Sequence, residues 1–86
     1  MEIDSIEALR KEIDGIDDKI VSLLLKRAEI TKEIYKIKNE NKMKTLSATR
    51  DMQIFQRITE GLNDLESDYL RMIYQEIFRA SHSLLE

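Results

Sequence analysis

The fold is decided by residues 5–41, which read SIEALRKEIDGIDDKIVSLLLKRAEITKEIYKIKNEN. Apolar side chains recur there at alternating steps of three and four residues, at Ile6, Leu9, Ile13, Ile16, Ile20 and Leu23, and then at Ile30, Ile34 and Ile37. This spacing is typical of an α-helix that buries one apolar stripe. Since no Pro or other breaker interrupts the stripe, we expect one helix from about residue 5 to residue 41, with Ser5 as its N-cap.

The rest of the chain predicts two shorter helices. Polar residues dominate from 39 to 49, which indicates a loop. A second helix should follow from an N-cap at Ser47 or Thr49 and end before Gly61, because glycine commonly follows a helix C-terminus. A third helix is expected from about Leu65 to the end of the chain. The predicted fold class is all-α, with three helices in one domain over residues 1–86.

The first helix requires a partner. Two short helices cover part of so long an apolar stripe, and the remainder would be a far larger exposed patch than monomeric proteins carry. The simplest partner is a second copy of the chain across a two-fold axis. We therefore expect an intertwined antiparallel homodimer.

Composition excludes several functional classes. With 14 Lys and Arg against 17 Asp and Glu, the formal net charge is -3, which disfavours binding to nucleic acid. The chain has no Cys and a single His, so we expect neither disulfides nor a metal site. It has no apolar run long enough to span a membrane, and its acidic N-terminus lacks the basic region of a secretory signal. We therefore expect a cytoplasmic protein that binds neither nucleic acid nor membranes.

A positive charge interrupts the apolar stripe. The spacing from Leu23 to Ile30 requires an apolar residue at position 27, which is occupied by Arg27. Because an unpaired guanidinium is costly to bury, Arg27 must meet an anion. That anion is either an acidic side chain of the protein, such as Asp17 or Glu66, or the carboxylate of a ligand, which suits the planar guanidinium.

Three further basic residues suggest an anion-binding pocket. Lys38 lies eleven residues after Arg27 and projects from nearly the same face of a helix. Arg50 can pack against this stretch, because the second helix returns antiparallel to the first. Arg10 lies 28 residues before Lys38, about 42 Å along a straight helix, so it reaches only the pocket of an antiparallel partner. For Lys38 and Arg50 taken singly, an ordinary surface position is the alternative.

The remaining polar residues predict no further chemistry. His82, the one histidine, is expected on the surface of the third helix. Ser22, Ser81 and Ser83 have no histidine placed to activate them, so nucleophilic catalysis is not expected. The three tyrosines are expected in the core or at its rim.

Five segments together resemble the all-helical (AroQ-class) chorismate mutase family. They are residues 9–17 (LRKEIDGID), 23–27 (LLLKR), 34–38 (IYKIK), 50–51 (RD) and 77–81 (IFRAS). Members of that family are intertwined helical dimers that rearrange chorismate to prephenate, without cofactor or metal, in the biosynthesis of phenylalanine and tyrosine. The resemblance spans essentially the whole chain and implies the same fold, dimer and activity here.

The resemblance also implies a role for each basic residue. Arg27 and the partner's Arg10 would grip the substrate carboxylates. Lys38 would donate to the ether oxygen whose bond breaks, and Arg50 would form a further cationic wall. The expected catalytic residues are therefore Arg27, Lys38 and Arg10. Arg50 is expected to bind the substrate.

Four other residues complete the implied site, and three of them depart from the family pattern. Ser47 and Asp51 would contact the ring hydroxyl, and Ser81 would assist at a carboxylate. Ser47 stands where Asp is common, Asp51 is a shortened Glu, and Leu85 replaces the Gln or Glu that donates to the ether oxygen. Leu85 is expected one helical turn after Ser81, facing the pocket beside Lys38. With that donor missing, we expect weak activity.

Three alternatives stay open at this level. The first is an isochorismate pyruvate-lyase, which uses a similar basic pocket. The second is a non-catalytic or weakly active regulatory domain that partners a shikimate-pathway enzyme. The third is a helical dimerisation module without a ligand, against which Arg27 in the apolar stripe argues.

Overall fold

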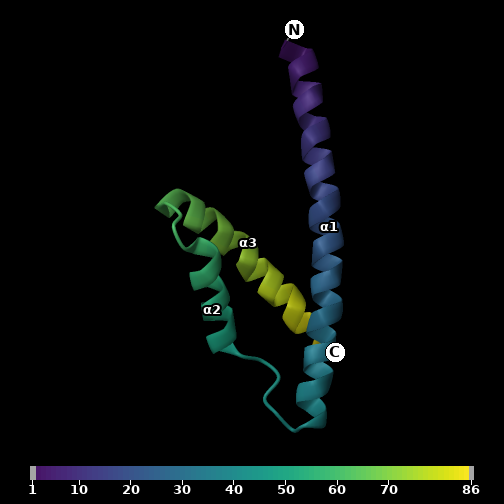
Figure 1. Ribbon diagram of the computed structural model, residues 1–86, viewed down its shortest axis with the longest axis vertical. Helices are drawn as coiled ribbons and strands as arrows, with labels where there is room; N and C mark the ends of the chain where they lie inside the picture. The colour runs from purple at the N-terminus through teal and green to yellow at the C-terminus, as the bar shows by residue number, and fades with distance from the viewer. Residues whose placement is uncertain (1, 86) are drawn as a thin grey trace. The chain divides into compact units, whose positions relative to one another are not determined.

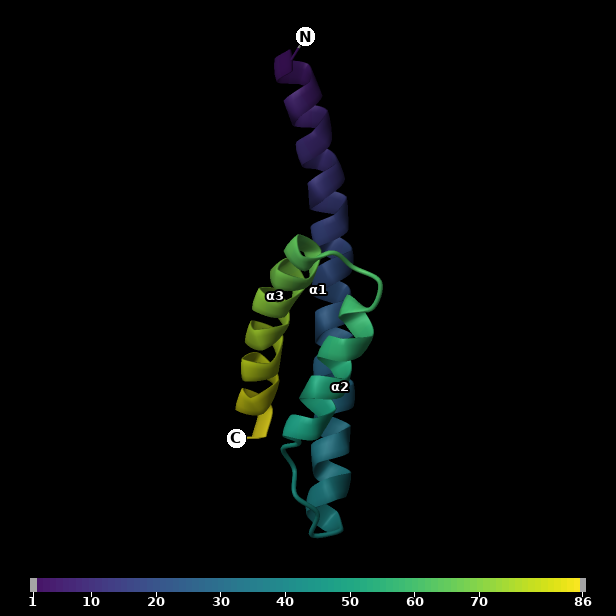
Figure 2. The same ribbon diagram turned by 90° about the vertical axis from the view of Figure 1, so that its left-hand side faces the viewer.

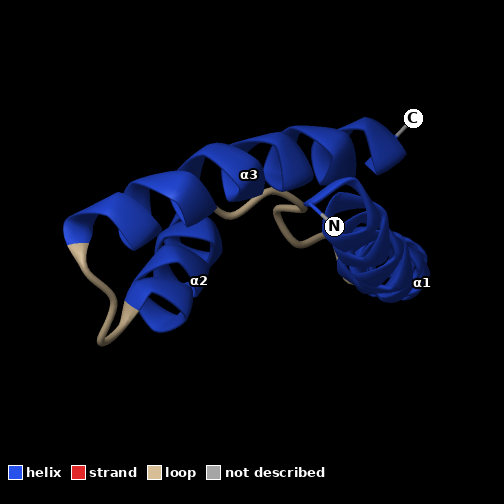
Figure 3. Ribbon diagram, turned by 90° about the horizontal axis from the view of Figure 1, so that it is seen from above, coloured by secondary structure: helices blue, strands red, loops and turns tan. Residues whose placement is uncertain are grey.

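The computed structural model describes residues 2–85, which are helical apart from two short connections (Figures 1 and 3). The elements are α1 (Glu2–Glu40), α2 (Ala48–Thr59), α3 (Asp64–His82) and a short 3₁₀ helix, η1 (Ser83–Leu85). The predicted all-α class with three α-helices is confirmed. The chain divides between Ile30 and Thr31, inside α1, into two units that we describe separately. None of the helices among the described residues is both long and apolar enough to cross a membrane.

The long helix α1 forms where the apolar stripe predicts it, but it begins earlier. Its first residue is Glu2, so Ser5 lies inside the helix, and the prediction of Ser5 as N-cap is wrong. Glu2 and Asp4 fall in the first turn, where carboxylates stabilise the positive end of the helix dipole. Lys38 falls in the last turn, where a cation is favourable. These charges support a start ahead of the predicted cap.

The bounds of α2 agree with the predicted capping residues. Ser47 has an extended backbone, with φ -137° and ψ 103°, and its Oγ accepts the backbone N–H of Arg50 at 3.1 Å. The helix ends at Thr59, and Gly61 follows with φ 77°, a left-handed conformation that a side chain disfavours. Both the N-cap at Ser47 and the terminating role of Gly61 are confirmed.

A reciprocal cap starts α3. The side chain of Asn63 accepts the backbone N–H of Glu66 at 2.8 Å, and the Glu66 carboxylate accepts the backbone N–H of Asn63 at 3.3 Å. The α-helix ends at His82, where the chain tightens into η1. The expectation that this helix continues unchanged to the end of the chain is therefore wrong over its last residues.

An aromatic cluster joins α2 to α3, which form a helical hairpin (Figure 2). Ile54 of α2 and Phe78 of α3 are each 7% exposed and form the buried core of the described residues. Phe78 meets Phe55 edge-on, with ring centroids 5.0 Å apart, and Tyr74 at 5.9 Å. The guanidinium of Arg71 lies 5.9 Å from the centroid of the Phe55 ring. Aromatic pairs of this kind add about 0.5–1.5 kcal/mol beyond burial, so the cluster fixes the hairpin.

Replacing Gly61 by Ala should lower the free energy of unfolding by about 1 kcal/mol, because alanine would have to hold a positive φ. Nothing lies within 4 Å of the position that the new Cβ would take, so the cost comes from the backbone. The matched control is Gly15→Ala inside α1, also with nothing within 4 Å, which should raise stability by up to ~1 kcal/mol. Urea unfolding measures both, and effects of the same sign would contradict this account of Gly61.

Candidate active site

Two of the predicted basic residues, Arg10 and Arg27, lie on α1 before Ile30. Arg10 pairs with Glu7 one turn earlier at 3.0 Å, with 68% and 61% of the two side chains exposed. So exposed a pair is worth tenths of a kcal/mol, which a ligand carboxylate readily displaces. Arg27 is half-buried, as is the adjacent Ala28, whereas the other described residues up to Ile30 are exposed. Within residues 2–30, the half-buried positions therefore coincide with the interruption of the apolar stripe.

Lys38 is held by the loop that follows α1. Its side chain is half-buried, and its Nζ donates to the backbone carbonyl of Thr45 at 3.3 Å. The backbone carbonyl of Lys38 accepts the N–H of Met43 at 2.7 Å. Lys38 thus lies in the last turn of α1, where a cation complements the helix dipole, and both its side chain and its backbone also anchor the loop.

The first turn of α2 carries Ser47, Arg50 and Asp51. Ser47 uses a lone pair of its Oγ for the helix cap, and its hydroxyl proton can still be donated. The side chain of Arg50 is exposed. Asp51 is half-buried, with 29% of its side chain exposed, and its backbone N–H donates to the carbonyl of Ser47 at 3.2 Å. This turn therefore presents one hydroxyl, one guanidinium and one carboxylate on a rigid helix end.

The C-terminal end of α3 carries Ser81, and η1 carries Leu85. Ser81 is half-buried, and its hydroxyl donates to the carbonyl of Ile77 at 2.8 Å. Leu85 is 41% exposed and lies in η1. Because a 3₁₀ turn advances by fewer residues than an α turn, Leu85 does not continue the helical face of Ser81. The prediction that Leu85 follows Ser81 by one α-helical turn is therefore wrong.

His82 brings the end of α3 to the start of α2. Its Nε2 lies 3.6 Å from Oδ2 of Asp51, with 41% and 29% of the two side chains exposed. His82 lies at the surface of α3, as predicted, and in addition contacts a predicted site residue on another helix. No signal for this contact is present in the sequence. The helices have 12 and 19 residues, so a short turn between them does not by itself bring Asp51 to His82.

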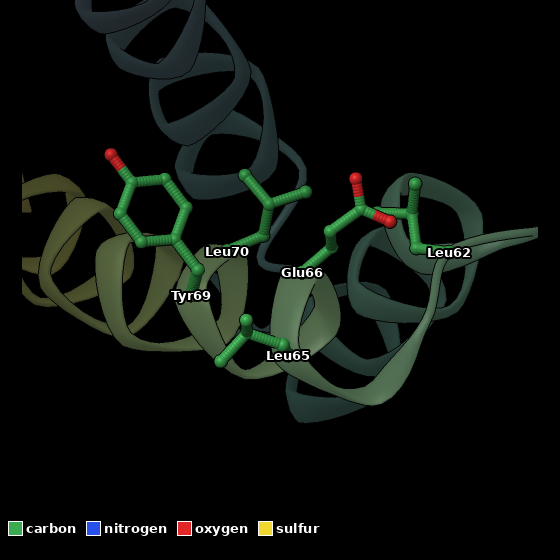
Figure 4. Close-up of a pocket in the computed structure, with 5 residues that line it drawn as sticks. All are labelled: Leu62, Leu65, Glu66, Tyr69 and Leu70. Atoms are coloured by element: carbon green, nitrogen blue, oxygen red, sulfur yellow. The ribbon is translucent and has the colours of Figure 1, made fainter.

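An apolar hollow lies at the opposite end of α3 (Figure 4). It is lined by Leu62, Leu65, Glu66, Tyr69 and Leu70. Its one charged residue is acidic, so it offers no cation to an anionic ligand, and it contains none of the predicted site residues. The hollow is not the candidate active site.

The site residues after Thr31 supply an ammonium, a guanidinium, two hydroxyls and a carboxylate, mostly on half-buried side chains. Such a set can bind an anion that also carries a hydroxyl group. Among residues 2–85, no group of three or more His, Cys, Asp or Glu side chains is placed to hold a metal ion. Arg10 and Arg27 add two guanidinium groups from α1. The described residues thus form an all-helical chain that carries basic and polar side chains on each of its three α-helices.

Comparison with known proteins assigns the domain to a family. The sequence pattern of chorismate mutase type II matches residues 9–85. The chain belongs to this family.

The relatives include both multidomain and shorter proteins. The bifunctional chorismate mutase/prephenate dehydratase of Aquifex aeolicus is 33% identical over 87 aligned positions, covering 95% of this chain and 24% of that protein. The intracellular chorismate mutase of Mycobacterium tuberculosis is 34% identical over 58 residues, 67% of this chain and 55% of that protein. The chorismate mutase of Methanocaldococcus jannaschii is 34% identical over 56 residues, 65% of this chain and 57% of that protein. The chain thus spans between a quarter and somewhat over half of these relatives. No solved structure gives a significant match.

Ser47→Ala should lower the free energy of unfolding by about 1 kcal/mol, because the backbone N–H of Arg50 loses its capping acceptor. Ser47→Asp keeps an acceptor and places a negative charge at the start of α2, so it should leave stability unchanged or raise it. Denaturant unfolding of the two variants checks this. If both variants lost the same free energy of unfolding, Ser47 would not act through the cap.

Proposed function

We propose that this chain is a chorismate mutase, which converts chorismate to prephenate in the cytoplasm on the route to phenylalanine and tyrosine. The family match over residues 9–85, in which all four predicted basic residues lie, is the observation that supports it most strongly. Relatives named chorismate mutase support the activity, and the name of the mycobacterial relative, intracellular chorismate mutase, supports the location. We take residues 1–86 as one catalytic domain.

The reaction suits the residues available. A Claisen rearrangement is unimolecular and needs neither a nucleophile nor a general base. The protein must hold a dianion in its compact chair conformation and stabilise the charge that develops as the C–O bond breaks. Even a millionfold acceleration requires about 8 kcal/mol of transition-state stabilisation. Fixed cations at a partly buried site supply stabilisation of this kind.

Lys38 is suited to act at the breaking bond. An ammonium group has three donors, of which one is directed at the carbonyl of Thr45. The remaining donors can reach a ligand while the Thr45 contact restricts the motion of the long side chain. In the proposed site Lys38 donates to the ether oxygen, and Arg27 and the partner's Arg10 bind the carboxylates.

The other site residues bind the periphery of the substrate. Arg50 adds positive charge, and Ser81 assists at a carboxylate by turning its hydroxyl from the carbonyl of Ile77 to donate to the substrate. Ser47 and Asp51, in the first turn of α2, bind the ring hydroxyl: the Ser47 hydroxyl proton is not used by the cap, and Asp51 offers carboxylate oxygens as acceptors.

We infer that the active form is a homodimer in which each site takes Arg10 from the other chain. No described residue of α1 is buried, and the side chains of its apolar stripe, from Ile6 to Ile37, are 46–65% exposed. A second copy brings an identical stripe, so two chains can bury both. The 28 residues between Arg10 and Lys38 are the reason for assigning Arg10 to the partner's site.

Incubation with chorismate tests the activity directly. The absorbance of chorismate should fall and prephenate should accumulate at a rate proportional to protein concentration. Lys38→Ala serves as the control for contaminating mutase, because it should lose most of the rate. A wild-type rate no higher than that of Lys38→Ala would contradict the proposed function.

Mixed dimers test the sharing of Arg10. Arg10→Ala and Lys38→Ala should each be nearly inactive, since each removes a cation from both sites of a homodimer. A dimer formed from one chain of each variant should contain one intact site, so co-refolding equal amounts should recover about a quarter of wild-type activity. A mixture as inactive as its two parents would show that Arg10 and Lys38 of the same chain serve one site.

Leu85 lies in η1 rather than on the helical face of Ser81, so Leu85→Gln tests whether a side chain at this position still reaches the ether oxygen. If it does, kcat should rise by roughly 10- to 100-fold, because a hydrogen bond to an oxygen gaining charge is worth about 1.5–3 kcal/mol. The effect should exceed any change in KM, since the contact strengthens mainly in the transition state. Leu84→Gln is the matched control, at the neighbouring half-buried position, and should give no such gain. Steady-state kinetics decide the matter, and an unchanged or lower kcat for Leu85→Gln would contradict this role of position 85.

A further inference from the structure

The contact between Asp51 and His82 differs from two ion pairs that lie within single helices. The Arg10–Glu7 and Arg79–Glu76 pairs each join neighbours on one helix and are more than 60% exposed. The pair of Asp51 and His82 joins two helices, and its side chains are 29% and 41% exposed. This contact is therefore less open to solvent than the two pairs within single helices, and it connects separate elements of the fold.

The two helix ends favour the same arrangement of charge. Asp51 lies in the first turn of α2, where the helix dipole stabilises a carboxylate, and His82 lies in the last turn of α3, where it stabilises a cation. In the antiparallel hairpin these ends are neighbours. The 3.6 Å between Nε2 and Oδ2 exceeds hydrogen-bond distance, so a hydrogen bond between them requires the two side chains to approach each other further.

The pair also joins two groups of site residues. Asp51 is flanked in the first turn of α2 by Arg50 and by the cap residue Ser47. His82 directly follows Ser81 and precedes η1, which carries Leu85. Because His82 faces Oδ2, the other carboxylate oxygen, Oδ1, remains to accept a hydrogen bond from a ligand.

We propose that His82 is a positioning residue, which orients the Asp51 carboxylate toward the ring hydroxyl of chorismate. This inference rests on the proposed function. His82 restricts rotation of the Asp51 side chain and thereby reduces the ordering cost when substrate binds. In its protonated form it also offsets the negative charge of Asp51, which would otherwise repel a dianionic substrate. Both effects act on binding more than on the chemical step.

Two substitutions separate the hydrogen-bonding role from ring packing. His82→Phe keeps a ring of similar width but has no donor, and it should raise KM for chorismate about 5- to 10-fold with kcat changed less than about 2-fold. His82→Gln retains an N–H donor near the place of Nε2 and should recover most of the wild-type KM. If His82→Phe does not fold, His82→Asn, whose donor is too short to reach Asp51, replaces it.

Arg79→Gln is the matched control for loss of positive charge from the end of α3. Arg79 lies one turn before His82, its side chain is 80% exposed, and it pairs with Glu76 rather than with Asp51. It should leave KM within about 2-fold of the wild-type value. A rise in KM as large as that of His82→Phe would overturn the proposal in favour of a general charge effect.

A double-mutant cycle with Asp51→Asn decides whether His82 acts through Asp51. In that background His82→Phe should change KM less than about 2-fold, because the carboxylate to be oriented is gone. Independent, multiplying effects of the two substitutions would overturn the proposal. A melting temperature lowered by His82→Phe with KM unchanged would also overturn it, since that result describes a purely structural residue.

Binding of chorismate by the same variants keeps this inference separate from the proposed function. If the wild type binds chorismate in titration calorimetry without converting it, the mutase activity is wrong, and dissociation constants take the place of KM in the cycle. Coupling between His82 and Asp51 in those constants would still support the positioning role. A wild type that neither binds nor converts chorismate would overturn both.

Discussion

The apolar stripe of α1 is the constraint on which the rest of the structure depends. A helix of 39 residues without a buried side chain gains little from its own charge pairs, each of which is worth tenths of a kcal/mol. Most helix stability in proteins comes from packing of an apolar face, so this stripe must be covered in the functional molecule. A second copy of α1 offers a matching surface.

Arg27 lies within the stripe, and a partner that covers the stripe therefore also encloses a guanidinium. Dimer formation and assembly of the anion site would then be one event.

The hairpin of α2 and α3 serves a different purpose. Its aromatic cluster around Phe78 gives a small core that is independent of the stripe. One end of the hairpin carries the cap residue Ser47 and the contact between Asp51 and His82. It also carries Ser81, whose hydroxyl donates to a backbone carbonyl one turn earlier. Asp51 lies in the first turn of α2, where the helix dipole favours a carboxylate, and His82 lies in the last turn of α3. The hairpin thus holds polar groups at fixed positions, whereas α1 carries Arg10, Arg27 and the apolar stripe to which we assign the proposed dimer interface.

The sequence was sufficient where local physics decides the structure. A repeat of apolar residues predicts the extent of α1, a serine before a polar first turn predicts the cap of α2, and Gly61 predicts its end. It was insufficient where an element departs from ideal geometry or depends on tertiary packing. The 3.6-residue period places Leu85 on the face of Ser81, but the chain tightens into η1 before reaching it. His82 gains its partner from the packing of two helices, which a periodic pattern along one helix does not describe. The roles of Arg10 and Arg27 depend on a second chain and a ligand, so they stay predictions.

The most direct test of the account is the thermal melt of the wild-type protein over a wide range of concentration, combined with sedimentation equilibrium. If the stripe of α1 is buried against a second copy, unfolding and dissociation are coupled. The melting temperature should then rise steadily between about 1 and 100 µM protein, and the sedimenting species should have twice the mass of the chain. A folded species with the mass of one chain, and a melting temperature independent of concentration, would contradict the central claim.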